Sequence, residues 1–309
     1  VKTQEALQQP KQQSGEKVKK PLFCRDDLFY LGIGTLIPAI VMLVGYILIR
    51  VWPFGDGTGL IIDSLHQYLP FYTEFHDKLV SHESLFYSLS GGLGYDFWAT
   101  YAYYFASPLN FLIALVPTAN VGDFMDFMIL LKVALCGGVF SWYLHRRNRD
   151  LPYLPLVFGT MFAVGNFLIG YYFNLMWLDS IAVVPIIMYG IEKLTCGESG
   201  RVYGIALFYG LWCNYYIGFM LCIFSCLCLV VCFVLRKGIS LRQILHRGLR
   251  FAWYSLLAGG LASVVLLPAY RSLTASESMI ENRFPSTIKF YVNAAELLVS
   301  HFVSEHPIN

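Results

Sequence analysis

The sequence predicts an all-α fold, a polytopic bundle of about six transmembrane helices, and two observations lead to this prediction. Apolar residues make up 57% of the 309 positions and charged residues only 14%, whereas about a quarter of an ordinary soluble domain is charged. Residues 28–49 contain no charge, and neither do residues 251–270. Each run is long enough to cross a hydrocarbon core of about 30 Å.

Six apolar stretches follow one another along the chain, near residues 28–49, 124–144, 153–173, 177–194, 202–235 and 251–271. The fifth stretch is too long for one crossing and barely long enough for two. A single crossing would also move the basic linker at 236–250 to the outside. We therefore divide the stretch at 214–218 and expect a short fifth helix before the break.

The distribution of Lys and Arg predicts how the spans are oriented in the membrane. The polar segment 1–27 is rich in basic residues, whereas the loop 50–123 is acidic, with Arg50 and Lys78 as its only Lys or Arg residues. Because basic segments stay in the cytoplasm, we expect a cytoplasmic N-terminus and an outer loop. The expected organisation is a tail at 1–27, a transmembrane domain at 28–271 and an extracytoplasmic, truncated segment at 272–309.

Composition also argues against several functions. A net charge of +2 gives no electrostatic support for nucleic-acid binding. Five of the eight cysteines fall in one hydrophobic segment and none lies in the loop 50–123. Such cysteines are expected to pack as small apolar residues rather than to form disulfides or a metal site.

Asp63 is the leading candidate for chemistry. A helix starting near residue 59 would place Asp63, His66 and Gln67 on one face by three-and-four spacing, and Pro70 would then end or kink it. A carboxylate at that position could take a proton from an acceptor hydroxyl. The alternative is a solvated loop acid beside a solvated histidine.

Two charges fall within the apolar stretches. Lys132 sits near the middle of the second stretch, and Asp179 lies near the outer end of the fourth. An isolated charge in hydrocarbon costs several kcal/mol, so Lys132 needs a partner or water, and either Asp179 or Asp126 could pair with it. Both Lys132 and Asp179 are candidates for substrate binding, and a purely structural ion pair is the alternative.

The outer segments offer further candidate binding residues. Arg271 and Arg283 are among the few cations expected outside, where a lipid-borne phosphate would need them; for Arg271, snorkelling at a helix end is the alternative. Tyr103 and Tyr104 belong to an aromatic run that could stack on sugars or form an interfacial belt. The apolar piece 109–117 is too short to cross and is expected to lie in the outer interface.

Several segments together resemble the YfhO family of bacterial membrane proteins. They are DSLHQYLPFY (63–72), SLFYS (84–88), GGLG (91–94), YYFASPLN (103–110), WLD (177–179), GIEK (190–193), NYYIG (214–218) and LLP (266–268), with Pro185. They occur in the right order over about residues 28–300. As a set they are specific, although each alone is weak.

That family resembles a branch of the GT-C glycosyltransferases. The resemblance implies a multi-span enzyme that takes a sugar from a polyprenyl-phosphate donor and passes it, with inversion, to an envelope polymer such as teichoic acid. It implies that Asp63 is the general base and that Arg271 or Arg283 holds the lipid phosphate. It makes a divalent metal possible without assigning ligands, and family members are usually longer than this chain.

Two other functions remain open at this stage. In a transporter or lipid flippase, Lys132 and Asp179 would form a charge pair along a polar path through the membrane. The long outer loop and the lack of a visible internal repeat speak against it. A non-catalytic scaffold for envelope assembly is the third possibility.

Overall fold

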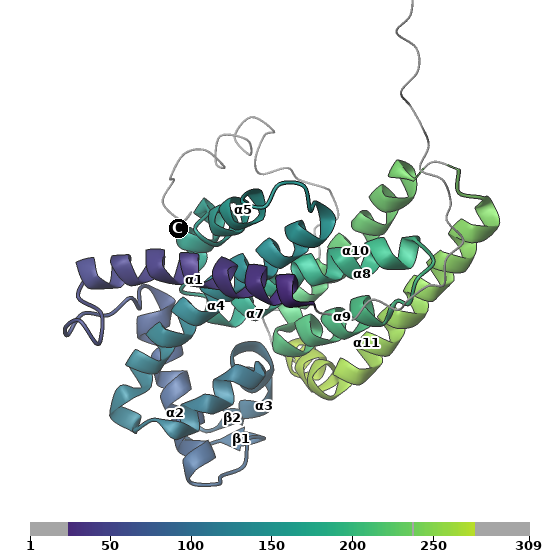
Figure 1. The fold of residues 1–309 in the computed structure, drawn as a ribbon. Coiled ribbons are helices and arrows are strands. Elements are labelled where there is room, and N and C mark those ends of the chain that lie inside the picture. Colours follow the sequence, from purple (N-terminus) through teal and green to yellow (C-terminus); the bar gives the residue numbers. More distant parts are fainter. Residues whose placement is uncertain (1–23, 237, 276–309) are drawn as a thin grey trace, which may run out of the picture.

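The computed structural model describes residues 24–236 and 238–275. The expectations for the tail at 1–23, for Arg283 and for most of the segment 272–309 lie outside these residues. Within the described part, six helices or broken helices are long and apolar enough to cross a membrane. The continuous ones are α1 (Arg25–Leu48), α4 (Val121–Arg147), α10 (Tyr215–Leu235) and α11 (Leu241–Ala275). The all-α bundle is thereby confirmed (Figure 1).

The third and fourth spans are each broken, which the sequence did not predict. The third consists of α5 (Leu154–Ala163) and α6 (Asn166–Tyr171), and the fourth of α7 (Leu175–Ala182) and α8 (Val184–Thr195). Pro185 lies in the first turn of α8, where its missing N–H costs no intrahelical bond. Composition stays apolar through both breaks, so hydropathy alone cannot reveal them.

The division expected in the fifth stretch is confirmed. The short helix α9 (Arg201–Cys213) ends immediately before Asn214, and α10 begins immediately after it. The Asn214 side chain accepts a hydrogen bond from the Ile217 N–H at 2.9 Å. This bond satisfies one of the free N–H groups at the start of α10.

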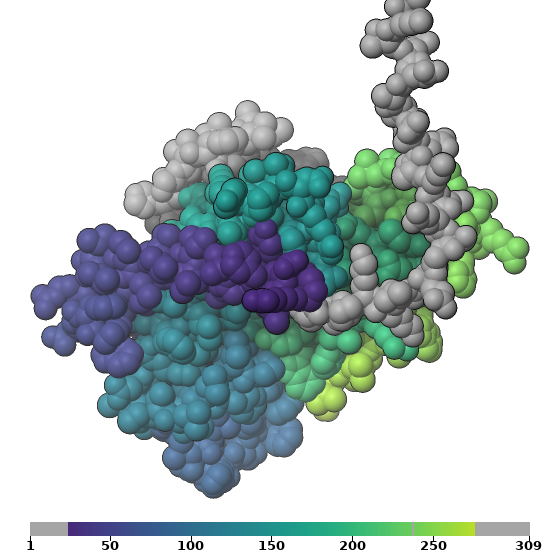
Figure 2. All heavy atoms as spheres, in the orientation of Figure 1, coloured from purple at the N-terminus to yellow at the C-terminus, as the bar shows by residue number. Residues whose placement is uncertain are grey.

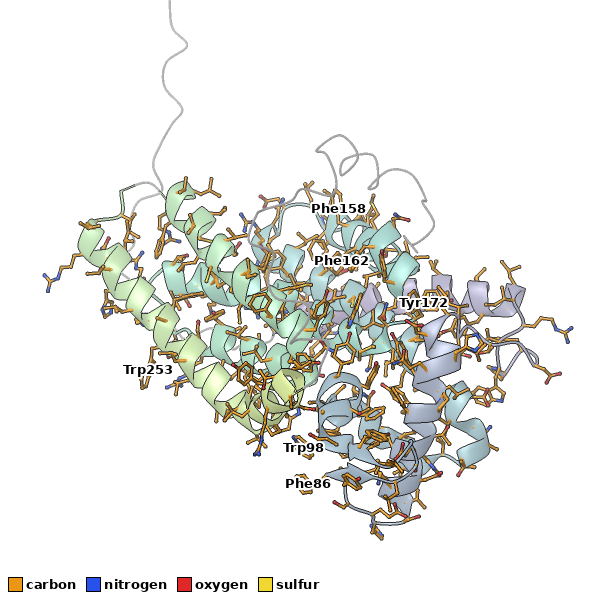
Figure 3. The ribbon with its side chains drawn as sticks, turned by 180° about the vertical axis from the view of Figure 1, so that it is seen from behind. Phe86, Trp98, Phe158, Phe162, Tyr172 and Trp253 are labelled. Atoms are coloured by element: carbon orange, nitrogen blue, oxygen red, sulfur yellow. The ribbon has the colours of Figure 1, made fainter. Side chains whose placement is uncertain are left out.

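The spans differ in how far they are enclosed. In α4 and in α7 with α8, 61% of the most apolar window is buried, against 17–22% in the remaining spans. Large apolar side chains on the outer helices point away from the bundle, as Trp253 of α11 does in Figure 3. A bilayer is the environment that such surfaces fit. The two enclosed spans are also the ones that carry Lys132 and Asp179.

Small residues bring α1 close to α4. A Cβ atom added at Gly138 would lie 2.0 Å from the Thr35 hydroxyl oxygen, and one at Gly34 would lie 2.5 Å from Ser141. Close approach through small residues is a common way for transmembrane helices to associate without a hydrophobic driving force. α4 also packs against α5 and α7, so it is the central helix of this half of the bundle.

Residues 50–120, which we call the loop domain, fold into a body of their own at one end of the bundle (Figures 1 and 2). Its elements are the π-helical turn η1 (Ser64–Tyr68), α2 (Leu69–Val80), β1 (Tyr87–Ser88), β2 (Tyr95–Asp96), α3 (Phe97–Thr100), the π-helical turn η2 (Tyr101–Phe105) and the 3-10 helices η3 (Pro108–Leu115) and η4 (Thr118–Asn120). The two short strands pair antiparallel. The helix expected at 109–117 is thus present, wound as a 3-10 helix.

Aromatic packing holds the loop domain together. The rings of Phe75 and Phe105 stack with their centroids 4.6 Å apart, and both side chains are fully buried. Tyr72 and Phe97 are fully buried beside them. On its surface, Phe86 stacks on Trp98 with centroids 5.1 Å apart (Figure 3). The loop is therefore a folded domain rather than a flexible connection.

The expected effect of Pro70 is partly wrong. Pro70 does not end the helix; it lies at the start of α2, which follows η1 without interruption and continues to Val80. The winding changes from π to α at this point, and the missing N–H of Pro70 falls in the first turn of the α-helix, where it is tolerated.

Candidate active site

Lys132 and Asp179 form an ion pair inside the bundle. The Lys132 Nζ lies 2.7 Å from the Asp179 Oδ2, and the two side chains are 1% and 2% exposed. Of the two partners that the sequence left open for Lys132, the structure places Asp179 against it. Asp126 lies elsewhere and binds backbone.

Neutral groups complete the surroundings of this pair. Lys132 also donates to the Asn110 Oδ1 at 3.1 Å and to the Leu175 carbonyl at 3.4 Å. The second Asp179 oxygen accepts from the Ser107 hydroxyl at 2.8 Å and from the Tyr209 hydroxyl at 3.0 Å. A buried pair of charges is tolerable only with such additional bonds. No substrate can reach either side chain in this conformation, which favours the structural alternative.

The same network fixes the loop domain to the spans. Ser107 and Asn110 belong to the loop domain, whereas their charged partners belong to α4 and α7. Ser107 is 1% exposed and Asn110 is fully buried. Their positioning role was not predicted, although both occur in the segment YYFASPLN that carries the family resemblance.

Tyr103 and Tyr104 are held from several sides. The Asn214 Nδ2 donates to the Tyr103 carbonyl at 2.9 Å. The Tyr104 carbonyl accepts from the Tyr72 hydroxyl at 3.0 Å and from the Asn110 Nδ2 at 3.3 Å. The backbone of η2 is therefore fixed by side chains of α2, η3 and the α9–α10 junction, while both tyrosine side chains stay partly exposed.

Asp63 is exposed and sits next to a strained residue. Ile62 has a φ of 51°, a left-handed conformation that is rare for a β-branched residue and costs about 1–3 kcal/mol. The buried Ser64 hydroxyl donates to the Ile61 carbonyl at 2.6 Å and accepts from the Ile61 N–H at 2.8 Å. Asp63 itself has no hydrogen-bond or ion-pair partner among the described residues, so its carboxylate is free to meet a substrate.

Gln67 and Tyr104 lie near Asp63 on the loop domain. The Gln67 Nε2 donates to the Tyr104 hydroxyl at 3.1 Å. Burial raises the pKa of Tyr104 to about 12, and the nearby Asp63 carboxylate adds to this. The pKa of Tyr68 is also raised, first by burial and then by surrounding groups that include Asp63. A protonated phenol at Tyr104 can therefore donate a hydrogen bond at neutral pH.

His66 is exposed and has no described contact with Asp63, contrary to the grouping expected from α-helical spacing. A π-helical turn holds more residues than an α-helical turn. A side chain three positions after Asp63 is therefore rotated away from it, whereas one four positions later remains near its face. This winding keeps Gln67 with Asp63 and separates His66 from both.

Asp126 positions the segment that leads to Asp63, a role that sequence reasoning missed. Its carboxylate accepts from the Gly59 N–H at 3.1 and 3.2 Å and from the Thr58 hydroxyl at 2.9 Å. The Tyr172 hydroxyl donates to the Gly59 carbonyl at 2.8 Å. A Cβ atom at position 59 would lie 2.8 Å from the Asp126 Oδ1, so only glycine fits there without displacement. The GDGTG sequence that contains Gly59 was the available signal.

Arg271 lies near the C-terminal end of α11, which packs against α3 and η2 of the loop domain. Val265 and Ala269 of α11 share an apolar cluster with Phe105. The exposed Arg271 side chain is thus at the same end of the bundle as Asp63.

The described part of the chain offers no metal site. No group of three or more His, Cys, Asp or Glu residues within it could hold a metal ion. The described residues therefore assemble no donor set for the divalent cation that the resemblance left possible.

In the described part of the chain, two enclosed spans lie among four more exposed ones, and a folded loop domain is attached at one end; these features define a multi-pass α-helical membrane protein. The model of the family "bacterial membrane protein YfhO" matches residues 34–306, most of the chain. The chain therefore belongs to the YfhO family, which confirms the resemblance drawn from its motifs. Neither the curated proteins nor the solved structures gave a significant match.

Proposed function

We propose that this chain belongs to a membrane glycosyltransferase of the GT-C type. It would transfer a sugar from a polyprenyl-phosphate carrier to an envelope polymer, such as teichoic acid, on the outer face of the bacterial cytoplasmic membrane. Membership of the YfhO family and the multi-pass fold support the class of protein. The site around Asp63 supports the chemistry.

The observation that carries the proposal is the setting of Asp63. Its carboxylate is exposed and has no partner in the described part. The Ser64 hydroxyl, however, holds the backbone of Ile61, two residues before Asp63, and the intervening Ile62 is strained. Strain of this kind persists only where the surroundings impose it, and it clusters at functional sites. A solvated acid on a surface loop would need neither a fixed backbone nor a strained neighbour. The surroundings of Asp63 therefore support a general base rather than a solvated loop acid.

The reaction needs proton removal and charge stabilisation. Asp63 would accept the proton of an acceptor hydroxyl as its oxygen attacks the anomeric carbon of the donor sugar. The bond from that carbon to the phosphate oxygen would break at the same time, and the phosphate would keep the electron pair. Attack from the face opposite the leaving phosphate inverts the anomeric centre.

The other groups at this end suit the binding roles. Tyr103 and Tyr104 offer partly exposed aromatic faces for a sugar, and Gln67 offers an amide beside them. Arg271 supplies a cation for the lipid phosphate. Lys132 and Asp179 would act indirectly, because their enclosed pair fixes Ser107 and Asn110 at the start of η3.

The test is an Asp63→Asn variant of the full-length protein, assayed for transfer from a polyprenyl-phosphate sugar in membranes. We expect a loss of at least about 100-fold in turnover, the contribution usual for a general base, with unchanged expression. Asp56→Asn is the matched control, because Asp56 is another exposed acid of the loop domain. Full transfer by the Asp63 variant would contradict the proposal. Loss of lipid or solute movement in a Lys132→Ala variant that keeps its fold, with Asp63→Asn silent, would favour a transporter.

A further inference from the structure

A second site lies at the other end of the bundle, where the helices end in basic residues. A groove of about 720 Å³ opens between α4, α8 and α10. Its polar rim includes Arg147, the last residue of α4, and Arg236, directly after α10. The loop domain joins α4 at the opposite end, so this groove is separate from the candidate active site.

The walls of the groove are apolar and the rim is charged. Phe140, Met188 and Val231 line the walls, one from each of the three helices. Val231 and Leu235 are 54% and 72% exposed on the adjoining surface of α10, so the groove continues into the face that meets lipid. The groove is apolar along its walls and carries arginines where the spans end. This arrangement suits a lipid whose chains lie along the walls and whose headgroup lies at the membrane interface.

The charges on the rim add up to one unmatched cation. Among its Lys, Arg, Asp and Glu residues, the lining holds two arginines, Arg147 and Arg236, and one carboxylate, Glu192, which is a formal balance of +1. Arg147 pairs with Glu192, which also accepts from the Tyr143 hydroxyl at 2.8 Å. Glu192 therefore neutralises Arg147 and leaves Arg236 as the cation available to a ligand.

Arg236 has no carboxylate partner among the described residues. Its Nη2 atom donates to the Cys196 Sγ at 2.6 Å, and a thiol is only a weak acceptor. A guanidinium can bind a phosphate through two parallel hydrogen bonds, which are stronger and more directional than its contact with sulfur. A single phosphodiester also carries the one negative charge that the rim lacks.

We propose that this groove binds one anionic phospholipid, with its phosphodiester at Arg236 and its acyl chains along the apolar walls. The bound lipid would join the ends of α4, α8 and α10. The inference rests on the membrane-spanning fold and not on the proposed glycosyltransferase activity. A zwitterionic lipid fits less well, because its ammonium group has only the already paired Glu192 as a counter-charge.

The experiment measures lipid retained by the purified full-length protein. We would exchange detergent-solubilised protein into nanodiscs of phosphatidylglycerol mixed with phosphatidylcholine, release it again, and count bound lipids by native mass spectrometry. The wild type should keep one phosphatidylglycerol in preference to phosphatidylcholine. Arg236→Gln should lower this retention by about tenfold or more, equivalent to about 1.4 kcal/mol.

Two further variants make the result specific. Arg242→Gln removes another cation near this end, outside the groove, and should retain lipid as the wild type does. Val231→Trp fills the groove without changing charge and should also lose the lipid. Equal retention by the Arg236→Gln and Arg242→Gln variants, equal binding of both lipids, or displacement by inorganic phosphate alone would overturn the proposal.

Discussion

The backbone N–H of Gly59 donates to both carboxylate oxygens of Asp126, at 3.1 and 3.2 Å. This contact joins the start of the loop domain to the central helix α4, four residues before the candidate base Asp63. The loop domain is therefore attached to α4 through the segment that leads to Asp63. Its position relative to the spans is fixed by polar contacts as well as by apolar packing.

Gly59→Ala tests this clamp. The new Cβ would meet the Asp126 Oδ1 at 2.8 Å and push the segment away from α4. We expect sugar transfer to fall by about tenfold or more, since displacement of a catalytic group by about 1 Å can cost 100-fold. Activity in membranes, compared with expression, is the measurement. Gly45→Ala in α1 is the control, because a Cβ there meets no atom within 4 Å; equal activity of both variants would contradict the clamp.

Ile62→Gly tests the strain beside Asp63. Glycine adopts a positive φ without cost, so removing the strain of about 1–3 kcal/mol should offset the entropy that glycine adds to the unfolded chain. We expect a melting temperature equal to or above that of the wild type together with lower transfer activity, because Asp63 is then less firmly presented. Thermal unfolding in detergent and the transfer assay measure the two effects. A variant that is both less stable and fully active would refute the role given to Ile62.

Lys132→Met should destabilise the protein strongly. It leaves the Asp179 carboxylate buried without its counter-ion, a change that costs about 3–5 kcal/mol when one partner of a buried pair is removed. The double variant Lys132→Met with Asp179→Leu removes both charges and should recover part of the loss. The measurement is the melting temperature of the wild type, the Lys132→Met variant and the double variant. A double variant less stable than Lys132→Met would show that the network around Asp179 matters more than the pair itself.

Asn214→Ser separates two functions of one side chain. Serine can still accept the hydrogen bond that caps α10, but it is too short to replace the amide that donates to the Tyr103 carbonyl. We expect a loss of about 1 kcal/mol from the buried carbonyl and a higher KM for the sugar donor. Asn214→Ala should cost about 1 kcal/mol more, because the cap is lost too. Thermal unfolding and donor titrations measure the two effects, and identical behaviour of the two variants would argue against the capping role.

The sequence could predict much of the fold because charge in hydrocarbon is costly. Runs without charged residues predicted where the spans lie. The stretch 202–235 had to be divided to keep the basic linker after residue 235 on the cytoplasmic side, and the structure has a helix break at Asn214. The same cost required a partner for Lys132, which proved to be one of two named acids. The breaks at Gly165 and Val183 could not be predicted, because they change backbone direction without changing composition.

The candidate site was harder to predict because backbone groups build much of it. Asp126 is held by a backbone N–H and by the Thr58 hydroxyl, and no spacing of side chains reveals a backbone donor. The π-helical winding of η1 was also not expected, because the residue spacing was interpreted with α-helical geometry. Of the two expected neighbours of Asp63, this winding keeps Gln67 and turns His66 away. Arg271 is exposed near the C-terminal end of α11, and its place at the end of the bundle that carries the loop domain depends on the packing of α11 on α3, which no sequence pattern reveals.

The proposed reaction requires that the loop domain bearing Asp63 face the outside of the cell, where the carrier lipid would present its sugar. Labelling of a Leu93→Cys variant with a membrane-impermeant maleimide in intact cells tests this orientation, because Leu93 is 99% exposed in the loop domain. The native exposed Cys196 at the basic end serves as the opposite reporter. We expect the cysteine introduced at position 93 to be labelled in intact cells and Cys196 only after lysis. Labelling of Cys196 in intact cells, with position 93 protected until lysis, would contradict the proposed function.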